Sequence, residues 1–339
     1  MFAPTVKEIE KTAPAFAELT DLAAERLGGK VLYATDDFFA EKENLIKPGR
    51  GIFIADKYTD RGKWMDGWES RRKRTPGHDW CVVQLATAGK IRGFDIDTHF
   101  FLGNHPPHAS IEAAYLDPKT QVTDWENAAV NWVKILPKSP LDPGSQNFYA
   151  CTSETVFTHL RLHIYPDGGV ARLKVFGEVH KNWDEVEPGQ PVDLAAAANG
   201  ALAIQCNDMF FSAMSNLLMP GRGVNMGDGW ETKRNRTPGN RDWVIVRLAR
   251  PGQIRKILVD TCHFKGNYPD RCSIEGCLSD SDETVLQGRV EWLELLPEQK
   301  LSADFEHFFE SQINPHQQSS HIPLNIFPDG GISRLRLWS

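Results

Sequence analysis

The chain contains an internal duplication, and this feature limits its fold more than any other. Several separated blocks recur about 162 residues further on, in the same order. The densest block, GKWMDGWESRRKRTPGHDW at 62–80, matches VNMGDGWETKRNRTPGNRDW at 224–243, with one extra residue in the second copy. Chance composition does not bring blocks into register in this way, so we predict two domains that share one fold.

The other matched blocks set the expected domain boundaries. Two pairs lie on the same register: IRGFDIDTHFFLGNHP with IRKILVDTCHFKGNYP, and IYPDGGVARLKVFG with IFPDGGISRLRLWS. We therefore expect a leader at 1–27, a first repeat at 28–180, a linker at 181–200 and a second repeat at 201–339.

The segments between turn signals are short and typical of strands. CVVQLA, VIVRLA and IRGFDID are rich in β-branched or alternating apolar residues and are bounded by Gly, Pro or Asp. Helical spacing is confined to residues 15–27, and Pro-Asp-Gly-Gly near the end of each repeat indicates a hairpin. We predict an all-β protein of two tandem jelly-roll β-sandwich repeats with a short helical N-terminal leader, and with function on the loops.

Composition and motifs exclude several classes of function. The formal net charge of −7 disfavours nucleic acid as a partner, because such binding requires phosphate neutralisation. The N-terminal residues lack the apolar core of a secretory signal, no segment is long enough to span a membrane, and the six cysteines form no CxxC pair. We therefore expect a cytoplasmic protein with reduced thiols and no membrane partner. The absence of GxGxxG, Walker and GxSxG motifs disfavours nucleotide cofactors and serine-hydrolase chemistry.

The densest repeated block contains several arginines that could bind an anion. Arg72 and Arg74 recur as Arg234 and Arg236, and a guanidinium group matches a carboxylate with two parallel hydrogen bonds. The alternative is that these arginines pair with Asp66, Glu69 and Asp79 in an ion network that orders the loop. The sequence favours neither interpretation over the other.

The histidines are the side chains best suited to proton transfer, and the two copies differ in them. His78 aligns with Asn240 or Arg241, and His263 aligns with Phe100. This divergence indicates either that one copy has become structural or that one site is assembled from both domains.

Carboxylates recur at matched positions and could act as bases or metal ligands. Asp97 and Asp260, each followed by threonine, could instead close turns through bonds from their side chains to the backbone. No HxH, HExxH or CxxC pattern supports a structural metal. The sequence thus requires no cofactor, and a loosely held divalent cation stays open as an alternative.

The motifs GKWMDGWESRRKRTPGHDW and DTHFFLGNHPP, the PDGG turn and the duplication itself closely resemble the allantoicase family, from about residue 28 onward. The resemblance implies hydrolysis of allantoate, a small ureide, to (S)-ureidoglycolate and urea. It also implies jelly rolls similar to galactose-binding domains and a cytosolic homo-oligomer. It does not supply catalytic residues position by position.

Allantoate is a carboxylate that bears two neutral ureido groups on one carbon, so it needs a cationic clamp and amide-matching polar groups. In our hypothesis Arg72 or Arg74 binds the carboxylate, Asn104 and Asp97 bind ureido groups, and proton transfer is carried out by Glu69, His78 or Asp79. A second or composite site would use the equivalent positions and their neighbours, namely Glu231, Arg234, Arg236, Asp242, His263 and Asn267.

Two other functions are compatible with such a fold. A jelly roll can bind a carbohydrate or another small ligand without catalysis, because fold alone does not determine function. A hydrolase of the neighbouring ureide, ureidoglycolate, would share the cationic clamp and differ in pocket size. The clustered acids, arginines and histidines favour an enzyme over a binding module.

Overall fold

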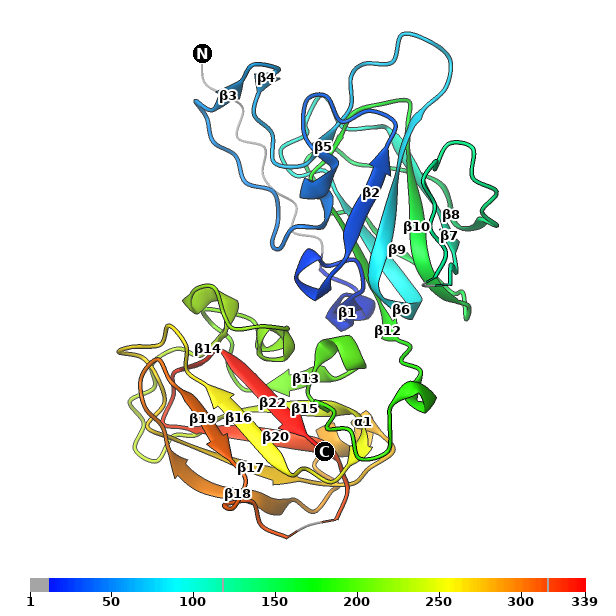
Figure 1. Ribbon diagram of the computed structural model, residues 1–339. Coiled ribbons are helices and arrows are strands. Elements are labelled where there is room, and N and C mark those ends of the chain that lie inside the picture. Colours follow the sequence, from blue (N-terminus) through cyan, green and yellow to red (C-terminus); the bar gives the residue numbers. More distant parts are fainter. Residues whose placement is uncertain (1–11, 118, 316) are drawn as a thin grey trace. The chain divides into compact units, whose positions relative to one another are not determined.

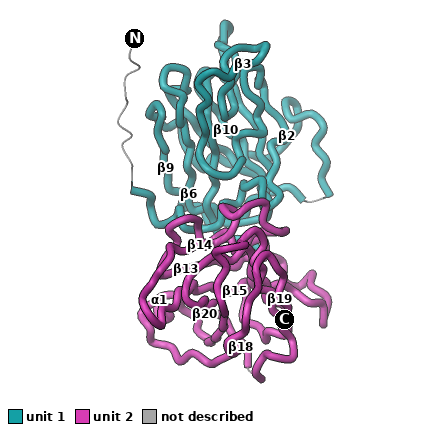
Figure 2. The backbone as a smooth tube through the Cα atoms, turned by 90° about the vertical axis from the view of Figure 1, so that its left-hand side faces the viewer, with its two compact units in different colours: residues 1–180 teal, residues 181–339 magenta. Residues whose placement is uncertain are grey.

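The computed structural model describes residues 12–117, 119–315 and 317–339 (Figure 1). The chain divides into two compact units, residues 1–180 and 181–339 (Figure 2). Both units consist almost entirely of strands and loops, so the predicted all-β class is confirmed. Among the described residues, no helix is both long enough and apolar enough to cross a membrane.

Unit 1 is built around one long strand. Its elements are η1 (Ala15–Glu18), β1 (Thr20–Asp21), η2 (Glu25–Leu27), β2 (Lys30–Ala34), η3 (Lys42–Ile46), β3 (Tyr58–Thr59), β4 (Gly62–Lys63), β5 (Trp68–Glu69), β6 (Asp79–Asp97), β7 (His108–Ala114), β8 (Val133–Pro140), β9 (Phe148–Ala150), β10 (Val156–Tyr165), β11 (Gly169–Val170) and β12 (Arg172–Val179). The strand order is β1-β12-β6-β10-β7-β8, and β2 and β9 also pair with β6.

Strand β6 connects the two layers of unit 1. Its first half pairs with β2 and β10, and its second half pairs with β9 and β12. CVVQLA and IRGFDID therefore belong to one continuous strand, where the sequence indicated two. The apolar residues of both halves face a common core, in which Trp68, Phe94 and Leu160 are fully buried. Side chains of this size each contribute roughly 1.5–3 kcal/mol when buried.

Unit 2 has the same strand arrangement, but two separate strands take the place of the long strand β6. Its elements are η4 (Trp183–Glu185), η5 (Ala197–Asn199), β13 (Leu202–Cys206), η6 (Met214–Leu218), η7 (Met226–Asp228), β14 (Trp230–Glu231), β15 (Asp242–Gly252), β16 (Lys256–Asp260), β17 (Arg271–Gly276), α1 (Asp282–Leu286), β18 (Leu293–Lys300), β19 (Glu306–Phe309), β20 (Ser319–Phe327), β21 (Gly331–Ile332) and β22 (Arg334–Trp338). A five-stranded sheet, β13-β15-β20-β17-β18, accompanies a three-stranded sheet, β19-β16-β22. These two antiparallel sheets form the expected jelly-roll sandwich.

The Pro-Asp-Gly-Gly turn does not close a hairpin, so that prediction is wrong. Strands β10 and β12, on either side of it, pair with different halves of β6 and not with each other. The short strand β11 inside the connection pairs with β5. The turn therefore crosses between layers and brings the functional loop of 62–80 against the sandwich. Unit 2 repeats this arrangement with β21 and β14.

The predicted leader and linker are partly built into the two folds. Residues 1–11 of the leader lie outside the described residues. The remainder forms η1 and η2 with β1 between them instead of one helix, because β1 pairs with β12 and Leu22 is fully buried. In the expected linker, Leu194 is also fully buried and its amide bonds to the carbonyl of Leu337. Short apolar runs at these positions complete each sandwich edge.

Candidate active site

The densest repeated block forms a loop that is anchored in the same way in both units. The indole Nε1 of Trp68 donates to the carbonyl of Asp36 at 2.8 Å, and Trp230 donates to Asp208 at 2.8 Å. Both tryptophans are fully buried. Each indole N–H is thus satisfied by the segment that precedes the loop in its own domain, and both residues pack the loop onto the core.

Glu69 and Asn104 form the first pair of predicted site residues that the structure brings together. The Asn104 amide Nδ2 donates to Glu69 Oε1 at 2.7 Å. Burial raises the pKa of Glu69, and the hydrogen bond from Asn104 offsets this rise only in part. A carboxyl group with a raised pKa is suited to donate a proton near neutral pH.

The crossing turn fixes the position of Asn104. Gly168 has a φ of +134°, and a Cβ atom there would lie 2.5 Å from the carbonyl oxygen of Asn104. The amide of the next residue, Gly169, donates to that same carbonyl at 2.8 Å. Only glycine permits both this backbone conformation and this close approach. The glycine pair of PDGG therefore holds the Gly-Asn loop against β5.

Unit 2 contains the same pair beside an open pocket. Asn267 Nδ2 donates to Glu231 Oε1. The pocket has a volume of about 600 Å³, and its lining consists of Phe211, Glu231, Thr232, Arg234, Gly266, Asn267, Tyr268, Asp270, Pro328, Asp329 and Gly330. Three of the six residues predicted for a second site, Glu231, Arg234 and Asn267, thus line one pocket.

The arginines Arg72 and Arg74 are exposed and form no ion pair with any described residue. The acids expected to neutralise them have other partners: Asp79 pairs with Lys73 and Asp66 pairs with Arg172. The structure therefore does not support the ion-network interpretation of Arg72 and Arg74. Two guanidinium groups at the loop surface are available to an anion.

The same holds in unit 2. Arg234 and Arg236 are exposed, and neither has an ion-pair partner within the described part of the chain. Arg234 lines the pocket beside Glu231, whereas Arg236 does not.

Asp79, which the sequence analysis assigned to proton transfer, is buried at the base of the loop. Its side chain is 1% exposed, and Oδ1 accepts hydrogen bonds from Lys73 Nζ at 2.7 Å and Thr35 Oγ1 at 2.9 Å. It holds the base of the loop. Its counterpart Asp242 is likewise buried and accepts from Asn207 and Asn240. A catalytic acid or base must reach the substrate, and these two carboxylates lie beneath the loop.

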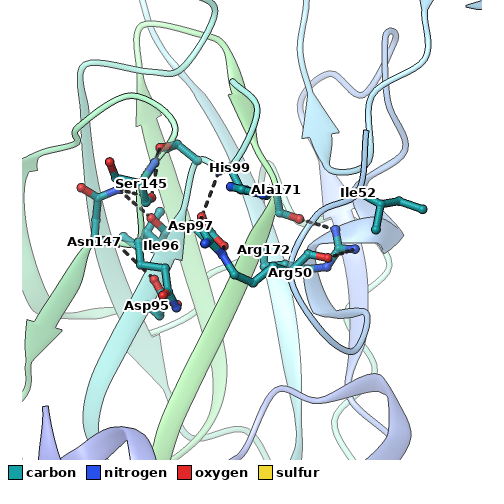
Figure 3. A network of polar contacts seen from close by, with 12 residues as sticks. Arg50, Ile52, Asp95, Ile96, Asp97, His99, Ser145, Asn147, Ala171 and Arg172 are labelled. Carbon is teal, nitrogen blue, oxygen red and sulfur yellow. Dashed lines mark hydrogen bonds and ion pairs between the residues drawn. The ribbon is translucent and has the colours of Figure 1, made fainter. Parts of the chain in front are cut away.

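Asp97 closes a turn, as the alternative interpretation proposed (Figure 3). Its carboxylate is 1% exposed and accepts from Arg50 Nε at 2.8 Å, from Arg50 Nη2 at 3.1 Å and from the His99 amide at 2.9 Å. Asp260 receives the equivalent bonds from Arg222 and Cys262. The Asp97 carboxylate is occupied by the protein, and we do not include it among ureido-binding groups.

His78 belongs to a relay of three side chains in unit 1. His78 Nε2 lies 2.9 Å from His163 Nδ1, and His163 Nε2 lies 3.0 Å from Glu112 Oε2. Because a carboxylate only accepts, His163 donates to Glu112 and accepts from His78. This arrangement leaves the Nδ1 lone pair of His78 available as a base.

The pKa shifts of the three side chains favour one protonation state of the relay. Burial lowers the pKa of His163 to about 4 despite the attraction of Glu112, and burial also lowers the pKa of His78. Burial would raise the pKa of Glu112, but hydrogen bonds from Arg161 and His163 outweigh it and lower that pKa. At neutral pH we therefore expect two neutral imidazoles backed by a carboxylate.

Glu112 and His163 were not among the predicted site residues. The available signal was that Glu112 recurs as Glu275 while His163 is replaced by Asn325. In unit 2 Asn325 Nδ2 donates to Glu275 Oε2 at 3.1 Å, and Asn240 stands near the position of His78. Unit 2 thus keeps the carboxylate and replaces both titratable rings with amides.

The His78–His163–Glu112 relay and the Glu69–Asn104 pair lie near opposite ends of one short segment, residues 165–168. The centroids of the His78 and Tyr165 rings lie 4.4 Å apart. Three residues further along the chain, the Gly168 carbonyl accepts a hydrogen bond from the Ser70 amide at 3.1 Å. Three residues of backbone span at most about 11 Å. The relay and the Glu69–Asn104 pair therefore flank the same short turn of the chain.

His263 does not line the unit 2 pocket. Its ring Nε2 donates to the carbonyl of Gly223 at 2.8 Å, and it lies beside Cys262 and Asp304.

Comparison with known proteins identifies the family. A family model described as the allantoicase repeat matches residues 20–180 and 192–339. A probable allantoicase of Photobacterium profundum is 53% identical over 325 residues, which cover 95% of this chain and 97% of that protein. A probable allantoicase of Burkholderia mallei is 49% identical over 332 residues, with 97% of each chain covered.

Solved structures agree with the sequence relatives. The crystal structure of allantoicase from Saccharomyces cerevisiae superposes with a TM-score of 0.80 at 38% identity and covers 94% of this chain and 92% of that chain. A second allantoicase structure gives a TM-score of 0.81 at 39% identity, with coverages of 95% and 93%. The duplication, the fold and the full-length relatives lead to one conclusion: this chain belongs to the allantoicase family.

Proposed function

We propose that this protein hydrolyses allantoate to ureidoglycolate and urea, and that unit 1 carries the reaction. The observation that carries the proposal is the Glu69–Asn104 pair, a carboxyl group with a raised pKa held by an amide within a loop that also presents unpaired arginines. Membership of the allantoicase family supplies the substrate class.

Substrate binding follows from the charges on the loop. Arg72 or Arg74 binds the carboxylate of allantoate through two parallel hydrogen bonds, because neither guanidinium group has an ion-pair partner among the described residues. Asn104 offers its carbonyl oxygen to ureido N–H groups while its amide remains bonded to Glu69.

The reaction requires one acid and one base. The bond from the central carbon to a ureido nitrogen breaks, a bond from that carbon to a water oxygen forms, and urea leaves with one added proton. Protonated Glu69 supplies the proton to the leaving nitrogen, and His78 Nδ1 accepts a proton from the attacking water. His163 and Glu112 orient His78 and act as positioning residues.

The pKa shifts of these two groups favour this division. Burial raises the pKa of Glu69 and lowers the pKa of His78, so the two values move toward each other. The active form needs Glu69 protonated and His78 neutral. We expect kcat to fall at low pH as His78 gains a proton and to fall at high pH as Glu69 loses one.

The unit 2 pocket supports a second role, ligand binding without turnover. It retains Glu231, Asn267 and Arg234 but has amides where unit 1 has His78 and His163. We propose that it binds the same carboxylate-bearing ureide without catalysing its hydrolysis. Under this proposal, ligand binding without catalysis, the alternative function of such a fold, is confined to unit 2.

The first experiment is to incubate purified protein with allantoate and to measure urea and ureidoglycolate over time. Equimolar release supports the proposal, and well-folded protein without turnover contradicts it. In a parallel reaction with ureidoglycolate as the sole substrate, faster urea release would instead assign the neighbouring ureide.

Arg72→Ala tests the clamp. We expect KM for allantoate to rise about 10- to 100-fold, because a charge-assisted bidentate contact is lost. Arg236→Ala is the matched control, an exposed arginine of the same loop in unit 2 that does not line the pocket. Equal KM values for both variants would show that Arg72 does not bind the carboxylate of allantoate.

We also propose that the protein acts as a cytoplasmic homo-oligomer. The six free cysteines fit a reducing compartment. Exposed apolar side chains, including Phe210, Phe211 and Val224 at 70%, 61% and 76% exposure, offer a surface that a second copy could bury. Light scattering coupled to size exclusion would test the assembly, and a strictly monomeric mass would refute it.

A further inference from the structure

Unit 2 holds a cluster of Cys262, His263 and Asp304 that the proposed reaction does not use. One ligand atom from each side chain lies within 4.8 Å of the other two. Cys262 and His263 follow strand β16 after one intervening residue, Thr261, and Asp304 lies in the loop before β19. Residues more than forty positions apart in sequence thus supply sulfur, nitrogen and oxygen donors to one place.

Hydrogen bonds orient the His263 ring and leave one nitrogen for a ligand. His263 Nε2 lies 2.8 Å from the Gly223 carbonyl, which can only accept, so Nε2 carries the proton and Nδ1 keeps its lone pair. A backbone carbonyl that fixes the far nitrogen of a histidine is the usual second partner of a metal-binding imidazole.

Asp304 is held by the backbone of the same cluster. Its Oδ1 accepts from the His263 amide at 2.7 Å, and Lys265 Nζ lies 4.0 Å from Oδ2. His263 and Asp304 have positive φ values of 71° and 51°. Such a conformation costs a non-glycine residue roughly 1 kcal/mol.

Unit 1 shows what the fold needs at these positions. Thr98 and Thr261 make equivalent side-chain bonds, to the carbonyls of Asp142 and Ser302. In that register His99, Phe100 and Gly144 correspond to Cys262, His263 and Asp304. Phe100 and Gly144 have φ values of 64° and 62°, so the backbone is the same and needs neither histidine nor aspartate. The donor set is specific to unit 2.

We propose that Cys262, His263 and Asp304 bind a divalent transition-metal ion of the Zn²⁺ class, with three protein ligands and a fourth position open to solvent. Thiolate and imidazole donors select such an ion over Mg²⁺ or Ca²⁺, which prefer oxygen. The Asp304 side chain is exposed, so an ion can reach the site from solvent.

Two positive side chains face the cluster, and both can be accommodated. The Arg222 guanidinium is held by two hydrogen bonds to Asp260, at 3.1 and 3.2 Å, and Glu306 lies 3.9 Å away, which offsets its charge. The Lys265 side chain is 77% exposed and its Nζ lies 4.0 Å from Asp304, so it can move into solvent when a cation binds.

The test is titration of chelator-treated full-length protein with Co²⁺, followed by competition with Zn²⁺. We expect about one Co²⁺ per chain, a thiolate-to-cobalt absorption band, and loss of that band when Zn²⁺ displaces Co²⁺. Cys262→Ser should abolish the band. His263→Phe and Asp304→Gly introduce the residues that unit 1 has in the same backbone conformation, so both should fold. Each removes a direct ligand and should weaken Co²⁺ affinity by more than the roughly 10- to 100-fold that follows loss of an outer-shell partner.

Cys206→Ser is the matched control, because this half-exposed cysteine of β13 is not part of the cluster. It should leave the band and the affinity unchanged. Absence of Co²⁺ binding by folded protein, binding without a thiolate band, or equal binding by all three cluster variants would each overturn the proposal. The readouts are spectroscopic, so they are independent of allantoate hydrolysis.

Discussion

The two units share a frame and differ in the groups that titrate. Both bury an Asp–Arg pair, Asp66 with Arg172 at 2.7 Å and Asp228 with Arg334 at 2.8 Å, beneath the functional loop. Among the residues that the structure describes, the His78–His163–Glu112 relay belongs to unit 1 and the Cys–His–Asp cluster to unit 2. Duplication preserved the residues that the fold and the Glu–Asn pair need, whereas the histidines and cysteines around them diverged between the units.

The largest expected effect, on kcat, tests which unit carries out catalysis. Glu69→Gln should lower kcat for allantoate about 100- to 10,000-fold, because the leaving urea loses its acid. Glu231→Gln, the same change in unit 2, should alter kcat less than about tenfold. Steady-state kinetics of both variants decides the comparison. Equal losses would mean that both units catalyse or that one composite site exists.

The buried pairs should respond alike in both units. Arg172→Met leaves Asp66 as an uncompensated buried charge, and we expect the free energy of unfolding to drop by about 3–5 kcal/mol. Arg334→Met should produce a similar loss through Asp228. Urea denaturation with a probe for each unit measures the effect. The double change Asp66→Leu with Arg172→Met should recover most of the loss, and no recovery would show that the pair has another role.

The relay should make unit 1 more sensitive to acid. The folded-state pKa of His163 is about 4 against 6.5 in the free side chain, so below about pH 6.5 the unfolded chain binds a proton that the folded chain does not. Stability contributed by neutral His163 is complete above pH 6.5 and declines as pH falls toward 4. His163→Asn, the residue found in unit 2, should remove on the order of 1 kcal/mol of this decline after solvent screening. Urea midpoints at pH 7 and pH 5 test it, and an unchanged difference would contradict it.

The smallest expected effect on stability concerns the exposed ion pair of Arg71 with Asp36, which attaches the 62–80 loop to the preceding segment. Arg71 binds Asp36 through Nε at 2.6 Å, whereas unit 2 has Lys233 at 3.5 Å from Asp208. Arg71→Lys should reduce stability by about 0.2–1 kcal/mol, since the Arg71 side chain is 63% exposed. Thermal unfolding in low and high salt measures it. A loss above about 2 kcal/mol would show that this pair is more than a surface contact.

Much of the fold was predictable because duplication and strand periodicity are local signals. The alignment of Trp68 with Trp230 and of Glu69 with Glu231 defined the functional loops. The hairpin prediction failed because a Pro-Asp-Gly-Gly turn fixes a change of direction without specifying which strands pair across it. Strand pairing depends on layers formed by residues far apart in sequence.

For the site, the residue types can be read from the chain alone: a repeated glutamate, asparagine and pair of arginines, together with histidines that differ between the copies. Which of these residues lie together depends on the tertiary structure. It paired Glu69 with Asn104, placed Asp79 and Asp97 in buried contacts, linked His78 to Glu112 through His163, and brought Cys262, His263 and Asp304 together. The physical reason is that burial and hydrogen bonding set the availability and pKa of a side chain, and both depend on neighbours contributed by distant strands.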